Sequence, residues 1–275
     1  MNRRIGLRRL GLVAAAAVTV FAAGCAMVQT TESGTVGIER KQYMSSMVPE
    51  GELRQEASKQ YNQTVSKARN LGRLDTDSTY VSRVRTISDR LIAQVGTFRP
   101  DARQWDWQIH VLDDDEINAW CMPGGKMAIN AGLIKRLEPT DAELAAVLGH
   151  EIAHALREHA REQVSQQMAT GMGLSVLAAL TGSAATSDLG AQLSNVMFTL
   201  PNSRTHEAEA DRIGVELAAR AGYDPRAAIT LWQKMAAAGG SRQPEFLSTH
   251  PSPASRMADL RQAAERVMPL YQKAR

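Results

Sequence analysis

The chain has 275 residues, of which 44% are hydrophobic and only 5% aromatic, a composition more typical of packed helices than of a β-sandwich or barrel. Its two cysteines exclude a disulfide-dense scaffold. The net charge of +3 comes from residues 1–24, which hold four arginines and no acid and leave 28 of the 32 basic and all 29 acidic side chains elsewhere. A nearly neutral remainder gives no electrostatic reason to expect a nucleic-acid partner.

Residues 1–24 are predicted to be a lipoprotein signal peptide. Four arginines lie within the first nine residues, and residues 11–23 form an uncharged apolar run that is short for a membrane span. The run ends in Ala22-Ala23-Gly24-Cys25, which resembles a lipobox, although Ala22 replaces the leucine that this motif prefers. An ordinary signal peptide cleaved nearby, with an incidental cysteine, is the alternative.

Cys25 is the predicted lipidation site. Residue 26 is Ala rather than Asp, which in Gram-negative lipoproteins implies sorting to the outer membrane. Residues 25–50 are polar with little periodicity, and we expect them to form a lipidated N-terminal tether to a domain at 51–275. The expected location is therefore the periplasmic side of the outer membrane, lipid-anchored through Cys25.

The first half of the domain combines helical and strand patterns. Apolar residues recur at helical spacing from Glu52 to about Phe98. Alternation over 107–112 predicts a strand, and residues 117–122 and 126–130 read as two strands around a tight turn at Pro123-Gly124-Gly125. A small sheet is therefore expected.

The second half is predicted to be helical. A long helix should run from a capping box at Thr140 and Glu143 to about Gln167. Residues 163–187 carry no charge, and we expect a small-residue helical pair against the core, because the polar content is too high for a transmembrane hairpin. Helical patterns return at about 203–221, 225–238 and 252–273. The fold class is therefore α+β and mainly helical.

The chemistry centres on His150-Glu151-Ile152-Ala153-His154. Residues four apart lie on one face of a helix, so the two imidazoles converge on a single metal ion. Glu151 lies beside them, placed to take a proton from a metal-bound water rather than to bind the metal. His159 follows His150 by nine residues, half a turn out of phase, and is expected to point away. A chance occurrence of the string is the alternative.

A zinc hydrolase needs a third protein ligand, and residues 203–211 offer one. Glu207 and Asp211 are four apart on a predicted helix and so share a face. We expect Glu207 to bind the metal and Asp211 to hold the imidazole N–H of a ligand histidine. Glu209 is rotated off that face, and His206 is one residue out of register. An exposed acidic helix is the alternative.

The combination resembles a known family. His150 to His154, followed by Ser-Arg-x-x-Glu-x-x-Ala-Asp at 203–211, is similar to the gluzincin metallopeptidases that include HtpX, the CaaX prenyl proteases, LoiP and BepA. Residues 118–125 and Thr249-His250-Pro251, with Arg256 downstream, are similar to further segments of that family. The resemblance covers roughly residues 50–270. Several membrane spans and a tetratricopeptide tail are not apparent, so a LoiP-like outer-membrane lipoprotein protease is the nearest expectation.

The resemblance implies a zincin-type metallopeptidase domain with a small sheet at the active-site cleft and one Zn²⁺ per chain. His250 is then a candidate fourth ligand or oxyanion donor, and a surface histidine is the alternative. Asn118 and Ala119 would offer a strand edge to an extended substrate. Cys121 and His110 are expected to be structural rather than catalytic.

The expected function is a zinc-dependent endopeptidase of the bacterial cell envelope that cleaves misfolded or misassembled envelope proteins. The resemblance also suggests outer-membrane assembly machinery or other lipoproteins as partners. Two alternatives stay open at this point. One is a chaperone-like adaptor lipoprotein with a latent zinc site, and the other is a zinc hydrolase of cell-wall peptides.

Overall fold

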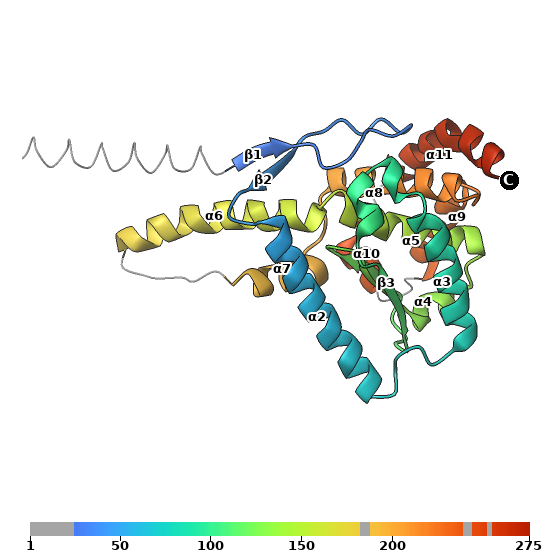
Figure 1. The fold of residues 1–275 in the computed structure, drawn as a ribbon, viewed down its shortest axis with the longest axis horizontal. Helices are drawn as coiled ribbons and strands as arrows, with labels where there is room; N and C mark the ends of the chain where they lie inside the picture. The colour runs from blue at the N-terminus through green and yellow to red at the C-terminus, as the bar shows by residue number, and fades with distance from the viewer. Residues whose placement is uncertain (1–24, 182–187, 239–243, 252–254) are drawn as a thin grey trace, which may run out of the picture.

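The computed structural model describes residues 25–181, 188–238, 244–251 and 255–275 (Figure 1). The predicted signal peptide at 1–24 lies outside the described residues. Helices dominate, which confirms the predicted fold class. They are α2 Glu50–Asn70, α3 Ser78–Ile92, α4 Ala131–Leu137, α5 Asp141–Leu156, α6 His159–Thr181, α7 Leu189–Phe198, α8 Arg204–Arg220, α9 Ala227–Ala238, α10 Glu245–Thr249 and α11 Ser255–Ala274, with 3₁₀ turns η1 Val95–Thr97 and η2 Pro100–Gln104.

The predicted small sheet is present. Its strands β3 Gln108–Leu112, β4 Ala119–Met122 and β5 Lys126–Asn130 have the order β3-β5-β4, with β5 parallel to β3 and antiparallel to β4. Gly124 and Gly125 both have φ of +83°, a left-handed conformation that favours glycine in the turn between β4 and β5. Among the described residues no strand pairs with the outer edge of β4, so this edge is free for another chain.

The long predicted helix is two helices. The Thr140–Glu143 capping box begins α5 as expected. The prediction of one helix to Gln167 is wrong, because α5 ends at Leu156 and Glu158 has φ of +53°. The backbone oxygen of Arg157 accepts a hydrogen bond from the side-chain amide of Gln42, at 2.5 Å. A distant side chain thus takes the place of a helical N–H donor at the turn.

Helices α5 and α8 form the centre of the core. They touch backbone to backbone: a Cβ on Gly214 would lie 2.7 Å from the backbone nitrogen of His150, and one on Gly149 would lie 2.9 Å from the Gly214 oxygen. Both positions therefore need glycine. Helix α8 also packs against α11, and side chains on nearly its whole circumference are buried. Polar residues on every side of α8 must consequently find partners inside the protein.

Helices α6 and α7 lie beside each other, and α6 extends beyond the body of the domain (Figure 1). The first turns of α6 pack against the rest of the domain, since Glu162, Val164 and Ser165 are buried. The prediction of a helical pair within 163–187 is wrong for the described residues, because 163–181 belong to the single helix α6 and α7 begins only at Leu189. Among the described residues, no helix combines the length and the apolar character needed to span a membrane.

The segment before α2 is part of the domain. Strands β1 Cys25–Val28 and β2 Gln42–Ser45 form an antiparallel hairpin, and β2 lies along α6. Four apolar side chains of the segment are 3% exposed or less: Val36, Ile38, Met44 and Val48. The expectation of a loose tether over 25–50 is therefore wrong for these residues, and the packed domain begins before residue 51. The polar composition of the segment predicted a tether wrongly, because polar residues such as Gln42 and Ser45 are themselves buried and hydrogen-bonded.

Ile38→Ala tests this packing. Ile38 is 2% exposed in the main core, so its truncation is expected to lower the free energy of unfolding by about 2–5 kcal/mol. Met27→Ala is the control, because Met27 lies in the same segment and is 61% exposed. Urea denaturation of both variants gives the comparison. Equal, negligible losses would mean that the segment is not packed in solution.

Candidate metal centre

Four buried side chains converge beside the contact of α5 and α8. His150 and His154 come from α5, Glu207 from α8, and His250 follows α10. One ligand atom from each lies within 4.8 Å of every other. The Nε2 atoms of His150 and His154 are 3.1 Å apart, and His154 Nε2 lies 3.3 Å from Glu207 Oε1. The structure thus brings together the three ligands and the candidate fourth ligand expected from the sequence.

The donor set fits a divalent metal ion. Glu207 is 2% exposed, yet neither of its carboxylate oxygens accepts a hydrogen bond of normal geometry. Arg256 lies beside Oε2, and a metal ion would complete the surroundings of Oε1 in this buried carboxylate. Two imidazole nitrogens and one carboxylate oxygen are donors that Zn²⁺ accepts in hydrolases. His150, His154 and Glu207 are therefore the residues that would hold such an ion.

His150 is oriented by a carboxylate. Its Nδ1 lies 3.0 Å from Asp211 Oδ1, and a carboxylate only accepts, so Nδ1 carries a hydrogen and Nε2 is the nitrogen that faces the metal position. Arg256 donates to both oxygens of Asp211, at 2.6 and 2.7 Å, and its NH1 lies 2.9 Å from Glu207 Oε2. Burial opposes ionisation, but Arg256 and His150 hold the pKa of Asp211 below its usual value.

Arg256 joins the two carboxylates that serve the site. Its guanidinium also lies 3.4 Å from the centroid of the Trp232 ring, and the residue is 3% exposed. The sequence marks Arg256 only as part of a family segment, without a role. Nothing in the spacing shows that a residue 45 positions after Asp211 would reach it.

Glu151 lies at the edge of the donor group. It is 3% exposed, its Oε1 lacks a hydrogen-bond partner, and that atom is 3.5 Å from His250 Nε2. Burial raises the pKa of Glu151 to about 8, against an opposing effect of His150. A carboxyl group with a pKa near neutrality can both accept and return a proton.

His250 is held with one imidazole nitrogen toward the donor group. Its Nδ1 lies 3.1 Å from the backbone oxygen of Phe246, and the two rings stack with centroids 4.2 Å apart. The segment is fixed by backbone bonds from Phe246 to Ile117 and from Asn202 to Thr249. At 6% exposure His250 is not the surface histidine of the alternative expectation.

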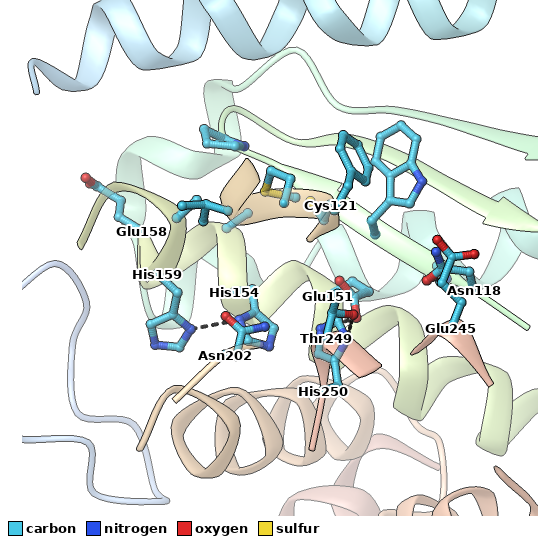
Figure 2. Close-up of a pocket in the computed structure, with 18 residues that line it drawn as sticks. Asn118, Cys121, Glu151, His154, Glu158, His159, Asn202, Glu245, Thr249 and His250 are labelled. Carbon is cyan, nitrogen blue, oxygen red and sulfur yellow. Dashed lines mark hydrogen bonds and ion pairs between the residues drawn. The ribbon is translucent and has the colours of Figure 1, made fainter. Parts of the chain in front are cut away.

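A cleft of about 620 Å³ opens onto these groups (Figure 2). Asn118 and Ala119 line it at the start of β4, whose outer edge is free. Trp120 and the end of α7, residues 196–198, give it an apolar wall, with Phe198 packed edge-on against Trp120. Cys121 is buried, and burial raises the pKa of its thiol well above normal, which excludes it as a nucleophile.

Three residues that were not expected to bind the metal are buried next to the donor group: His159, Glu209 and His206. His159 Nδ1 lies 2.9 Å from His154 Nδ1, so His159 does not point away from the site, although it is not in the ligand group. The predicted direction of His159 is wrong because it assumed one continuous helix from His150, whereas the helix breaks at Glu158. Glu209 and His206 are 5% and 3% exposed, and the alternative of an exposed acidic helix is wrong.

A helical domain with a small sheet at its cleft, two histidines on α5 and a carboxylate on α8 defines a zincin-type metallopeptidase. Residues 81–264 match the model of Peptidase family M48, and the chain belongs to that family. The gluzincin resemblance is thereby confirmed.

Characterised relatives agree with the family assignment. The chain is 38% identical over 199 residues to "Metalloendopeptidase OMA1, mitochondrial" of Bos taurus, which covers 68% of this chain and 37% of the relative. It is 31% identical over 224 residues to "Beta-barrel assembly-enhancing protease" of Escherichia coli (strain K12), covering 75% and 43%. The chain therefore spans less than half the length of these relatives. The similarity to mitochondrial members was not expected from the sequence.

Arg256→Met tests the charge balance of the site. The change leaves the buried Asp211 and Glu207 without their cation, so the metal-free protein is expected to lose about 3–5 kcal/mol of unfolding free energy. Arg83→Met is the control, since Arg83 pairs with the well-exposed Asp141 and should cost less than about 1 kcal/mol. Urea unfolding in excess chelator measures both. Similar small losses would contradict the assigned role of Arg256.

Proposed function

We propose that the chain is a zinc-dependent endopeptidase of the bacterial cell envelope that cleaves misfolded or misassembled envelope proteins. The observation that carries the proposal is the position of Glu151. It lies beside a donor group suited to zinc, in a cleft that also contains the free edge of β4. A purely structural metal site has no use for an additional buried carboxylate at that position.

The residues support hydrolysis of a peptide bond. A zinc ion held by His150, His154 and Glu207 would supply Lewis-acid activation of water and of the scissile carbonyl. Glu151 would accept the proton of the attacking water and return it to the leaving amine. His250 would either donate to the developing oxyanion or, in the position described, keep the site closed.

Extended polypeptides suit this cleft. The free edge of β4 can pair with the backbone of a substrate strand, a mode of binding that depends little on side-chain sequence. Folded proteins rarely present an unpaired strand, whereas unfolded ones do. The relative whose printed name is Beta-barrel assembly-enhancing protease, together with the export signal predicted at residues 1–24, favours envelope proteins as substrates.

Glu151→Gln provides the test of the activity. Wild-type residues 26–275 are expected to cleave casein, and the variant, which cannot accept a proton, should lose at least about 100-fold in rate. Both proteins should hold one zinc ion per chain, because Glu151 is not a ligand. Elemental analysis and the release of peptides give the two measurements.

The other outcomes separate the alternatives. If neither protein cleaves while both hold zinc, the site is latent, and His250→Ala should release activity unless the protein is an adaptor. Cleavage of cell-wall peptides without cleavage of casein would favour the cell-wall hydrolase. Failure of both to hold zinc would exclude the zinc assignment.

Cys25→Ser tests the proposed anchor. Labelled palmitate fed to cells is expected to enter the wild type and be absent from the variant, which should also leave the outer-membrane fraction. Cys121→Ser is the matched control and should retain the label, because that thiol is buried. Because Cys25 already pairs with Ser45 in the β1–β2 hairpin, an acyl chain there would hold the domain close to the membrane. Label persisting in Cys25→Ser would contradict the assignment.

A further inference from the structure

The Nδ1 atom of His154 lies against His159, whereas Nδ1 of His150 lies against the carboxylate of Asp211. We propose that Glu209 and His159 form a relay that fixes the tautomer and orientation of His154, and so prepare its Nε2 atom to bind the metal. The inference rests on the proposed zinc site. It assigns His159 as a positioning residue, not as a ligand or a group that touches substrate.

The hydrogen positions follow from the order of the three groups. Glu209 Oε2 lies 3.1 Å from His159 Nε2, and a carboxylate only accepts, so this nitrogen carries the hydrogen. In a neutral imidazole the other nitrogen, Nδ1, is then an acceptor. It lies 2.9 Å from His154 Nδ1, which must donate to it (Figure 2). His154 consequently keeps its Nε2 lone pair on the side of the donor group.

Glu209 is held in place as an acceptor. Arg40 donates to both of its oxygens, at 2.7 and 3.0 Å, and Arg157 donates to Oε2 at 3.1 Å. Glu209 is 5% exposed and Arg157 is fully buried. Two guanidinium groups therefore fix the position of the carboxylate, and one of them belongs to the segment before α2.

The ring of His159 is also fixed. It stacks on His206 with centroids 4.3 Å apart and planes inclined by 12°. His206 Nε2 in turn lies 3.1 Å from Glu162 Oε2. A half-turn of this ring would keep it stacked but break both nitrogen contacts, so its acceptor stays directed at His154.

The relay excludes a competing arrangement. His154 Nε2 is 3.3 Å from Glu207 Oε1, so the opposite tautomer could donate its Nε2 hydrogen to that carboxylate. Such a hydrogen bond would occupy the metal-binding atoms of both His154 and Glu207. The acceptor offered by His159 favours the Nδ1–H tautomer and leaves both ligands available.

The tautomers can be observed directly. In ¹⁵N-histidine-labelled wild-type protein, long-range ¹H–¹⁵N spectra should show His159 with hydrogen on Nε2 and His154 with hydrogen on Nδ1. The same pattern is expected before and after zinc is added, because the relay acts without the metal. Hydrogen on Nδ1 of His159 would overturn the proposal.

Two substitutions at residue 159 separate positioning from packing. His159→Phe keeps the ring and its stacking but removes the acceptor, and it should weaken zinc binding about 10- to 100-fold in competition with a chelator. His159→Asn places an oxygen near the former Nδ1 and should stay within about threefold of the wild type. The visible spectrum of the Co²⁺-substituted protein should change in the Phe variant alone.

Glu143→Gln is a matched control for general destabilisation, since Glu143 is a buried, hydrogen-bonded carboxylate at the far end of α5. Its zinc affinity should equal that of the wild type. The relay is wrong if the Phe and Asn variants bind zinc equally, or if affinity simply follows melting temperature across all variants. A wild type that binds no zinc would instead overturn the proposed function.

Discussion

The close approach of α5 and α8 is the constraint on which the rest of the structure depends. The helices meet at Gly149 and Gly214, where any side chain would collide with backbone of the facing helix. His150 follows the first of these glycines directly, and Glu207 and Asp211 lie on α8 within two turns of the second. Only at this separation can carboxylates from one helix reach imidazoles on the other. The metal centre is therefore built on a helix contact.

The burial of α8 removes the carboxylates of Glu207, Glu209 and Asp211 from water, and arginines distant in the sequence balance their charge. Asp211 and Glu207 are balanced by Arg256 from α11, while Glu209 on the other side of the helix is balanced by Arg157 and by Arg40. The carboxylates are fixed in place, because each donor approaches from a different element. This arrangement gives orientation rather than net stability, since buried ion pairs of this kind seldom add much to folding free energy.

Much of the site could be predicted from the sequence, because helical spacing fixes which side chains share a face. His150 with His154, and Glu207 with Asp211, are such pairs, and the structure brings them together. The outer partners could not be found in this way. His159 lies beyond a turn at Glu158 that no local signal marks, and Arg40 and Arg256 reach the site only through the tertiary fold. Periodicity assigns a face to a residue, but it cannot show what that face meets.

The segment before α2 shows the same limit and has a wider consequence. Its polar composition predicts a tether, yet Arg40 and Gln42 are inserted between α6 and α8 and hold Glu162 and Glu209. Only two side chains, Glu209 and His159, separate Arg40 of this segment from His154. If Cys25 carries the lipid, the β1–β2 segment that begins at the membrane also contributes Arg40 and Gln42 to the charge network beside the metal centre. Membrane attachment and the geometry of the site would then share one short stretch of chain, which a flexible tether would have kept apart.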